Sequence, residues 1–506
     1  MNFLVISNGG KGLSIRMSPK IYLTTTLPYV NADPHIGFAF EVVTADTIAR
    51  YHRLLGHEVF FNTGTDEHGQ KIFQLAVEAG MGNDYQKYVD LAHEKFRQLL
   101  PELGVIHSED GLNLNFIRTT DKNHAGAVWE FWKRVEKNGF IYKKLYKIKY
   151  CVGCELEKTD SELKNGRCSL HPNKEIEIRE EENYFFKFSA FQDKLLKLYA
   201  DQPDFVLPNS RFNEIKAFVE RGLEDFSISR LVEKMPWGFL VPGDQKHAIY
   251  VWFDALINYI SAIGWPEDEA NFHKWWPVIQ FAGKDNLRQQ AAMWQAMLMS
   301  AHLPPSKQII IHGFIVSGGQ KMSKSLGNVI NPLELVEEYG TDAVRYFLVR
   351  HVEPFEDTDV TLEKFKEIYN ANLANGLGNL VSRVMKMATV NNIKFEETEV
   401  KRVAETEEFK NYHQEQIKSF DNFEIQKAIE VIWREIGIAD KLIQLEQPFK
   451  KIKTEQTKAE KDIKNLLARL WFIAVTLKPF MPQTAQTIID LVTNNQMPDN
   501  PIFPRK

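Results

Sequence analysis

The sequence predicts an α/β protein in which a parallel sheet is interrupted by an insertion and followed by an all-helical region. Three observations indicate this fold class. Strand-like and helix-like segments alternate from residue 20, charged sequence that carries the cysteines breaks the alternation after about residue 142, and apolar residues keep helical spacing after residue 361. A chain of 506 residues, 44% hydrophobic and 25% charged, is long enough for roughly two to four globular domains.

The first elements are expected in the order strand, helix, strand. A β-rich run over 21–26 leads into a loop over 27–36 and a helix over 37–55, and a second strand over 58–62 ends in a turn rich in glycine and acids at 64–69. Alternating strands and helices favour a doubly wound parallel sheet, whose ligands bind beyond the carboxyl ends of the strands. Both loops are therefore candidate active-site loops.

The α/β pattern is interrupted at about 142–184, resumes near 250–281 and gives way to helices after 361. The interruption predicts an insertion that splits one domain. The helical spacing is carried by Leu373, Leu377, Leu380, Val381, Val384 and Met385, and later by Ile425, Ile429, Ile432, Ile436 and Leu442. We expect these helices to form a bundle that closes the chain.

The charge balance excludes a uniformly basic protein, because 62 basic residues face 67 acidic ones. A nucleic-acid partner needs only a local basic face. Residues 441–478 are one candidate, with nine basic and four acidic residues, although such a run is usually a solvated helix face. No run approaches the roughly 20 apolar residues of a membrane span, and the start lacks the apolar core of a secretion signal. We expect a cytoplasmic protein without membrane contact.

All three cysteines fall between residues 151 and 168. Cys151 and Cys154 are separated by two residues, and so are Cys168 and His171. Three sulfurs and one imidazole in two such pairs are typical of a closed tetrahedral zinc site, which has no open position for a reacting molecule. We expect one structural Zn²⁺; the alternative is a set of incidental reduced cysteines.

Two short motifs suit phosphate binding. Pro34-His35-Ile36-Gly37 leads into a helix, whose first N–H groups attract anions, although alone it also fits a capping histidine. Lys321-Met322-Ser323-Lys324-Ser325 lies between glycines, as a loop that closes on a polyphosphate requires, although alone it also fits a solvated basic turn. A G-x-x-x-x-G-K-[ST] phosphate loop is missing from the sequence.

The two motifs in this order resemble the signatures of class I aminoacyl-tRNA synthetases. Residues 26–37, 64–72 and 250–255 are similar to the methionyl-tRNA synthetase family of the bacterial type, and the resemblance extends from about residue 20 to residue 506. It implies an α/β fold: a split Rossmann-like catalytic domain with a zinc-binding insertion, followed by an all-α anticodon-binding bundle. The implied parts are an N-terminal extension (1–19), the first half of the catalytic domain (20–135), the connective insertion with the zinc knuckle (136–230), the second half (231–320), a connecting segment with the lysine loop (321–378) and the anticodon-binding domain (379–506).

The resemblance also implies a reaction. A methionine–tRNA ligase activates methionine with ATP and Mg²⁺ to methionyl-adenylate and transfers the methionyl group to the 3′ end of tRNA(Met). The expected partners are methionine, ATP and tRNA(Met), and we expect a monomer because no appended C-terminal domain follows. The catalytic groups would be His35, Lys321 and Lys324, which face the phosphates.

Site residues carried over from the family fall into three sets. Chemistry alone already makes Asp66 a partner for an ammonium group, although a turn or capping role fits as well. Trp252 and Tyr259 would share one face of a helix, which core packing also explains. The sets are Leu27, Tyr29, Asp66, Trp252, Ala255 and Tyr259 for methionine, His35, Gly37, Asp285, Lys321 and Lys324 for ATP, and Asn379, Arg383 and Phe449 for the anticodon.

The sequence departs from the family pattern at several of these places. Phe38 stands where the signature has a second histidine, Gln290 where many members have a pocket histidine, Leu256 where proline is common and Phe449 where tryptophan is usual. These departures keep three alternatives open: another class I aminoacyl-tRNA synthetase, a non-catalytic tRNA-binding paralogue, or a small-molecule adenylyltransferase with a related first motif.

Overall fold

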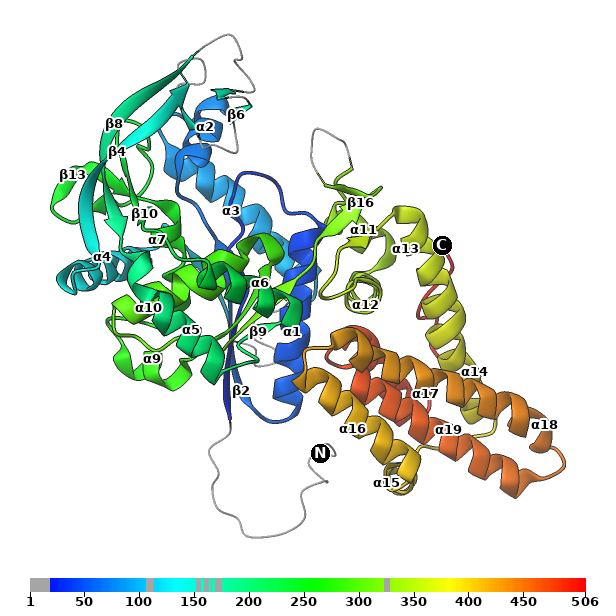
Figure 1. Ribbon diagram of the computed structural model, residues 1–506. Coiled ribbons are helices and arrows are strands. Elements are labelled where there is room, and N and C mark those ends of the chain that lie inside the picture. Colours follow the sequence, from blue (N-terminus) through cyan, green and yellow to red (C-terminus); the bar gives the residue numbers. More distant parts are fainter. Residues whose placement is uncertain are drawn as a thin grey trace.

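The computed structural model describes residues 19–105, 113–151, 156–158, 163–164, 166–168, 175–322 and 328–506. An α/β domain lies at the centre, a long β-hairpin extends from one end of it, and a helical bundle packs against the other end (Figure 1). The predicted α/β fold followed by helices is confirmed.

Six parallel strands form the central sheet, in the order β3-β2-β1-β14-β15-β9. Its strands are β1 (Lys20–Thr24), β2 (Glu58–Thr65), β3 (Asn113–Arg118), β9 (Val206–Leu207), β14 (Ile279–Gly283) and β15 (Gln308–His312). The sheet therefore joins strands from before and after the long hairpin, and its edge strand β9 comes from within residues 136–230.

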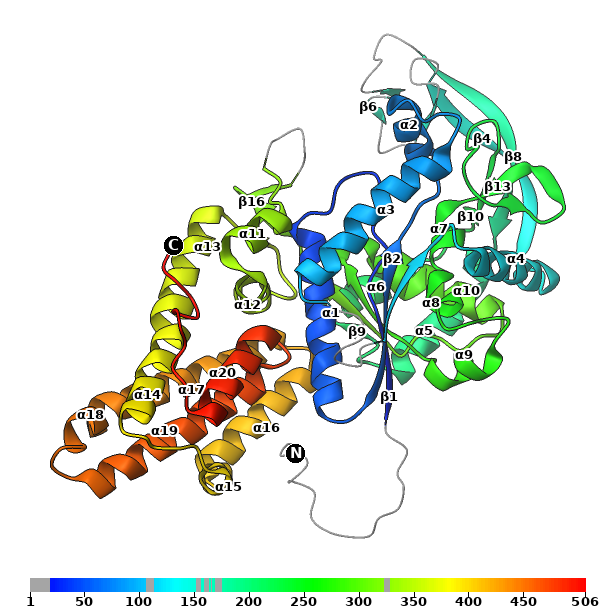
Figure 2. The ribbon, with the colours of Figure 1, turned by 180° about the vertical axis from the view of Figure 1, so that it is seen from behind.

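The helices of the α/β domain cover both faces of this sheet (Figure 2). They are α1 (Ile36–Leu54), α2 (Gln70–Glu78), α3 (Tyr85–Glu102), α4 (Lys122–Lys137), η3 (Phe188–Phe191), α5 (Gln192–Asp201), α6 (Asn209–Glu220), α7 (Val251–Ala255), α8 (Asn258–Ser261), α9 (Glu269–Trp275), η4 (Lys284–Asn286), η5 (Gln289–Met293) and α10 (Trp294–Ser300). Side chains of a strand alternate between the faces, so Phe281 and Ile310 enter one core while Ala282, Ile309 and Ile311 enter the other.

Four smaller sheets surround the central one. The hairpin β4 (Ile141–Cys151) and β8 (Ile176–Phe186) also pairs with β5 (Leu156–Lys158) and β10 (Phe226–Ser227). The others are β6 (Leu163–Lys164) with β7 (Arg167–Cys168), β13 (Asp244–Ile249) between β11 (Ser229–Leu231) and β12 (Leu240–Val241), and β16 (Ile315–Ser317) between β17 (Gln320–Lys321) and β18 (Thr358–Asp359). The hairpin thus extends away from the central sheet (Figure 1).

The remaining helices connect the α/β domain to the bundle and form the bundle itself. The connecting helices are α11 (Pro332–Tyr339), α12 (Thr341–His351), α13 (Leu362–Ile368) and η7 (Tyr369–Gly378). The bundle contains α14 (Asn379–Val390), α15 (Glu397–Ala404), α16 (Glu407–Asp421), α17 (Ile425–Glu446), α18 (Pro448–Lys451), α19 (Gln456–Leu477) and α20 (Pro482–Asn494). Among the helices of the described residues, none is long and apolar enough to cross a membrane.

One continuous hydrophobic core runs from the central sheet through α1 and α12 into the bundle. The buried guanidinium group of Arg345 on α12 reinforces this junction. It pairs with Asp46 of α1 at 2.7 Å and donates to the carbonyl oxygens of Pro479 and Phe480, just before α20, at 3.0 and 2.8 Å. Because a buried charge is stable only when it is paired and hydrogen-bonded, this residue ties α1 and the bundle together.

Candidate active site

A cavity of about 840 Å³ lies beyond the carboxyl ends of β1, β2, β14 and β15. A doubly wound sheet binds its ligands at this position, and a cavity of this size suits a nucleotide or another small molecule. The structure brings together at its wall nine of the predicted residues: Leu27, Tyr29, His35, Gly37, Asp66, Trp252, Ala255, Tyr259 and Asp285. Lys321 belongs to β17, and Lys324 lies outside the described residues.

His35 is the N-cap of α1. Its Nδ1 accepts a hydrogen bond from the backbone N–H of Gly37 at 3.0 Å, so in the neutral ring the hydrogen is on Nε2. A Cβ atom at position 37 would lie 2.7 Å from Cε1 of His35, and only glycine avoids this clash. The motif therefore combines the capping role with an imidazole donor at the positive end of a helix that faces the cavity.

Asp66 lines the cavity with a buried carboxylate. Its backbone is fixed by a bridge to the loop after β1, in which Asp66 N–H donates to Pro28 at 2.9 Å and Val30 N–H donates to Asp66 at 3.1 Å. The residue is 7% exposed, and its Oδ1 has no hydrogen-bond partner among the described residues. Burial and then the charge of Asp254 raise the pKa of Asp66 well above its ordinary value. A cation bound in the cavity would supply the missing partner.

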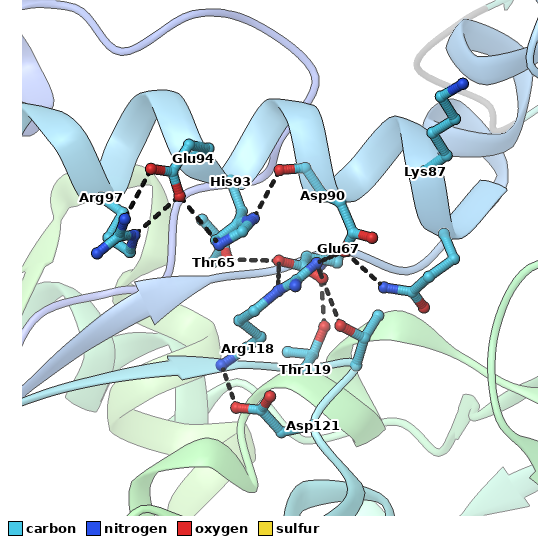
Figure 3. Close-up of polar contacts among 12 residues, drawn as sticks. Thr65, Glu67, Lys87, Asp90, His93, Glu94, Arg97, Arg118, Thr119 and Asp121 are labelled. Carbon is cyan, nitrogen blue, oxygen red and sulfur yellow. Dashed lines mark hydrogen bonds and ion pairs between the residues drawn. The ribbon is translucent and has the colours of Figure 1, made fainter.

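The neighbouring Glu67 holds this turn in place (Figure 3). Its buried carboxylate accepts two bonds from the Arg118 guanidinium, at 2.8 and 2.9 Å, and Arg118 also pairs with Asp90 of α3 at 2.6 Å. The hydroxyl groups of Thr65 and Thr120 also donate to the Glu67 carboxylate, the hydroxyl of Thr119 accepts from its backbone N–H, and Trp237 Nε1 donates to its backbone carbonyl at 2.6 Å. This cluster joins β2, β3 and α3 directly behind Asp66. The sequence analysis missed it, although Glu67 is part of the turn that it singled out.

A second buried carboxylate, that of Asp254, fixes the helices α7 and α8, which line the cavity as the Asp66 turn does. Asp254 lies on α7 between His68 Nδ1 at 2.7 Å and His124 Nε2 at 2.8 Å, and His124 Nδ1 lies 2.9 Å from the Ser261 hydroxyl. Burial alone would raise the pKa of Asp254, but these two histidines lower it below its ordinary value. Asp254 therefore stays ionised and holds α7 and α8 against the Asp66 turn.

Trp252 and Tyr259 reach the cavity from two separate helices. Their spacing of seven residues predicted a shared face of one helix, which is wrong, because α7 ends at Ala255 and α8 begins at Asn258. Both side chains still line the cavity, and the Tyr259 ring is buried. The Tyr259 hydroxyl accepts a hydrogen bond from Gln290 Nε2 at 2.8 Å. Gln290 therefore lines the cavity itself and also holds the hydroxyl of a second lining residue, Tyr259.

The α1 end of the cavity contains a carboxylate–imidazole pair. Glu41 of α1 accepts from the backbone N–H and the hydroxyl of Thr26, at 2.6 and 2.7 Å, and pairs with His312 Nε2 at 2.8 Å. Burial lowers the pKa of His312, but the hydrogen bond and the charge of Glu41 have the larger combined effect, so the pKa of His312 is raised. Nearby, the Phe38 ring packs edge-on against Phe96, with ring centroids 5.2 Å apart. Phe38 thus makes an apolar contact where the family signature has a histidine.

Two of the four predicted zinc ligands, Cys151 and Cys168, belong to strands that the structure describes. Cys151 ends β4 and Cys168 ends β7, whereas Cys154 and His171 lie outside the described residues. Within the described part of the chain, no cluster of three possible metal ligands occurs. The zinc prediction is therefore untested by the structure.

The three predicted anticodon residues lie on the bundle. Asn379 and Arg383 lie on α14, and Phe449 lies on α18 with 47% of its surface exposed. Arg383 pairs with Asp440 of α17 at 2.8 Å. The basic run over 441–478 is partly neutralised inside the bundle, because Lys451, Lys458, Lys464 and Arg469 form ion pairs with acidic residues there.

The split parallel sheet, the capped α1 and the cavity beside the lysine motif define a class I aminoacyl-tRNA synthetase. Residues 21–164 and 153–385 match the family model for class I tRNA synthetases (M), and residues 394–501 match the model for the anticodon binding domain of methionyl tRNA ligase. The chain belongs to the methionyl-tRNA synthetases, the ATP-dependent ligases that join methionine to tRNA.

Individual relatives agree with this assignment. The chain is 42% identical over 488 residues to the methionine–tRNA ligase of Thermosynechococcus vestitus, an alignment that covers 93% of this chain and 90% of that one. It is 40% identical to the enzyme of Rickettsia bellii, with 94% and 92% covered. The solved structure of the Mycobacterium tuberculosis methionyl-tRNA synthetase in complex with methionyl-adenylate matches with a TM-score of 0.83 at 34% identity, covering 96% of this chain and 95% of that one.

Proposed function

We propose that methionine and ATP react in the cavity beyond β1, β2, β14 and β15. The unpartnered Oδ1 of Asp66 carries this proposal, because a buried carboxylate without a hydrogen-bond partner among the described residues, on a residue that lines a cavity, suits the ammonium group of an amino acid. Tyr29, Trp252, Ala255 and Tyr259 offer the largely apolar surface that an uncharged thioether requires.

Activation needs no nucleophile from the protein. The carboxylate oxygen of methionine attacks the α-phosphorus of ATP, the bond to the β-phosphate breaks, and pyrophosphate leaves with the electron pair. His35 at the positive end of α1, with Lys321 and Lys324, would bind the phosphates and stabilise the charge that moves to the leaving group. Bound Mg²⁺ would neutralise further phosphate charge. In the second step the terminal ribose hydroxyl of tRNA attacks the methionyl carbonyl and AMP leaves.

Pyrophosphate exchange across the twenty amino acids tests this proposal. We expect ATP–pyrophosphate exchange that depends on methionine, with at most weak exchange for the other amino acids. Exchange that prefers leucine, isoleucine, valine or cysteine would contradict the assignment of the cavity to methionine. Absence of exchange with every amino acid would favour a non-catalytic tRNA-binding paralogue.

We further propose that Asn379, Arg383 and Phe449 contact the anticodon. An exposed ring on α18 can stack on an unpaired base, and an amide and a guanidinium group on α14 can bond to base edges. Recognition would involve exchange of the Arg383–Asp440 pair for a contact with RNA. We expect a cytoplasmic protein. We also expect a monomer, and sedimentation with and without tRNA would test this oligomeric state.

We also propose that Cys151, Cys154, Cys168 and His171 bind one structural Zn²⁺. The donor chemistry fits, because three thiolates and one imidazole complete a tetrahedral shell, and β4 and β7 end at two of the cysteines. Elemental analysis should find about one zinc per chain, and Cys168→Ser should lose it while keeping the central sheet. A zinc-free wild-type preparation in which all three cysteine thiols react freely would contradict the assignment. Met322→Leu, within the lysine motif and far along the chain from the cysteines, is a control that should keep the metal.

A further inference from the structure

An ion pair contacts the part of the cavity wall to which Asp285 and Phe314 belong. Its members, Lys284 and Asp357, do not line the cavity themselves. We propose that this pair is a positioning element, which holds Phe314 at a fixed place beside Asp285 and thereby sets the affinity of the cavity for the nucleoside part of ATP. This inference rests on the proposed function and assigns a role in it to two residues outside the cavity.

Asp357 uses both of its carboxylate oxygens in this cluster. Its Oδ1 accepts from the backbone N–H of Phe314 at 2.9 Å, and its Oδ2 accepts from Lys284 Nζ at 2.7 Å. The same ammonium group lies 4.7 Å from the centroid of the Phe314 ring, which is within the range of a cation–π contact. The ion pair therefore holds Phe314 at two places, its backbone and its ring.

The backbone brings Asp357 to this place independently of the ion pair. Strand β18 lies parallel to β16, and the N–H of Thr358 donates to the Phe314 carbonyl at 2.9 Å. A Cβ atom at position 313 would lie 2.1 Å from the carbonyl oxygen of Glu356, so only Gly313 permits the two segments to approach this closely. Removal of the ion pair should therefore leave the segment that carries Asp357 in place.

On the cavity side, the Asp285 carboxylate and the Phe314 ring meet above Gly283. A Cβ atom at position 283 would lie 3.0 Å from Oδ1 of Asp285 and 3.6 Å from Cε1 of Phe314. All three residues line the cavity, so the carboxylate and the ring border the same part of its wall. A nucleoside suits this part, because a base can pack on an aromatic ring and ribose hydroxyl groups can donate to a carboxylate.

The ion pair joins two segments just beyond the point where their strands stop pairing. The ladder between β14 and β15 ends with Gly283 opposite His312. Lys284 follows on the first side as the start of η4, and Phe314 follows on the second side, between β15 and β16. Backbone pairing between β14 and β15 does not extend to these residues, so a side-chain contact is needed to fix their separation.

The exposure of the pair separates a positioning role from a purely structural one. The side chains of Lys284 and Asp357 are 27% and 41% exposed, and exposed ion pairs contribute little to the free energy of unfolding. The hydrogen bonds from Lys284 and from the Phe314 N–H lower the pKa of Asp357, so its carboxylate is ionised at neutral pH. Removal of the pair should therefore weaken nucleotide binding with little loss of stability.

The test measures pyrophosphate exchange with the full chain in Asp357→Asn and Lys284→Met. Asparagine keeps an acceptor for the Phe314 N–H without the charge, and methionine keeps the length of the lysine side chain without the ammonium group. We expect each substitution to raise the KM for ATP about three- to tenfold, while the KM values for methionine and pyrophosphate and the melting temperature stay near those of the wild type. The inhibition constant of adenosine, a competitor without phosphate, should rise by the same factor as the KM for ATP.

Three further variants make the result specific to the pair. Asp357→Asn and Lys284→Met combined should raise the KM for ATP no more than the larger single effect, because each already removes the pair. Lys284→Arg, which keeps the charge and the contact with the ring, should keep a KM for ATP near that of the wild type. The matched control Asp201→Asn breaks the exposed Lys197–Asp201 pair of α5 and should change none of these quantities.

The outcomes separate this inference from the function on which it rests. If methionine is activated but neither single substitution raises the KM for ATP, the pair has no role in nucleotide binding and the inference is wrong. If the effects of the two substitutions multiply in the double variant, Lys284 contacts the nucleotide itself. If the KM values for ATP and methionine rise together with a lower melting temperature, the pair only supports the fold, and either result overturns the inference. If the wild type does not activate methionine, the proposed function itself fails.

Discussion

Replacement of Asp66 with asparagine should weaken methionine binding and stabilise the free enzyme at the same time. Asparagine keeps the shape of the side chain and removes its charge. Loss of one partner of a buried charge pair costs about 2 to 5 kcal/mol, so we expect the KM for methionine to rise roughly 30-fold or more. In the free enzyme the carboxylate is 7% exposed and its Oδ1 is unpartnered. Relief of such a group is worth about 1 to 3 kcal/mol of unfolding free energy.

The pH dependence gives these two effects opposite signs. Because the folded-state pKa of Asp66 is raised above its unfolded value, its contribution to stability is complete below the unfolded value and is lost as the pH rises through the folded value. If Asp66 binds the ammonium group as proposed, methionine binding needs the ionised carboxylate, so the KM should rise as the pH falls through the same range. Asp66→Asn should lack both dependences.

Pyrophosphate exchange at several pH values and thermal unfolding of the ligand-free protein measure the two effects of Asp66→Asn. The exposed Asp490 of α20, which accepts from Gln486, supplies the control: Asp490→Asn should change neither quantity. An unchanged KM in Asp66→Asn would show that the ammonium group binds elsewhere. A lower melting temperature would show that the carboxylate supports the fold, as its neighbour Glu67 does.

Three further substitutions test other parts of the site. Glu67→Gln should lower the unfolding free energy by up to about 3 to 5 kcal/mol, measured by urea denaturation, because it removes the buried carboxylate that binds Arg118 through two bonds and leaves only the more exposed Asp90 as its ionic partner. A loss no larger than that of Asp90→Asn would contradict this. Phe38→His should keep or raise the rate of single-turnover adenylate formation, since an imidazole can donate to phosphate, and an inactive variant would mean that packing on Phe96 positions α1. Phe449→Ala should slow tRNA charging and leave pyrophosphate exchange intact. The control Leu362→Ala, at another exposed apolar residue, should change neither reaction. A parallel loss of both reactions in Phe449→Ala would indicate a folding effect.

Local patterns predicted the order of the first elements but not where the second strand ends. The strand expected over 58–62 continues to Thr65 as β2, because residues that read as a polar turn pair with β3 and use their side chains inside the sheet. Asn62 donates to Thr24 and Asn258, and Thr25 donates to Thr63. Periodicity treats such polar residues as signs of a turn, and only the neighbouring strands reveal that they are buried and satisfied.

The candidate site was predictable where its residues fall in short motifs. The loops that carry His35 and Asp66 do line the cavity, as expected from their places after β1 and β2. The groups that hold these loops were not predictable, because the Glu67–Arg118 pair spans 51 residues and the pair formed by His124 with Asp254 spans 130. Neither pair has a fixed spacing that a pattern could detect.

The placement of α1 affects how every bundle variant must be interpreted. The N-terminus of this helix faces the cavity, while Asp46 in its middle pairs with Arg345, which in turn holds the carbonyl oxygens before α20. Activation and the packing of the bundle therefore share one rigid element, and they share one continuous core. A substitution inside this core can impair adenylate formation without any contact with substrate. Exposed positions such as Phe449, which lie outside the core, are therefore the ones at which the proposed recognition of tRNA can be tested separately from adenylate formation.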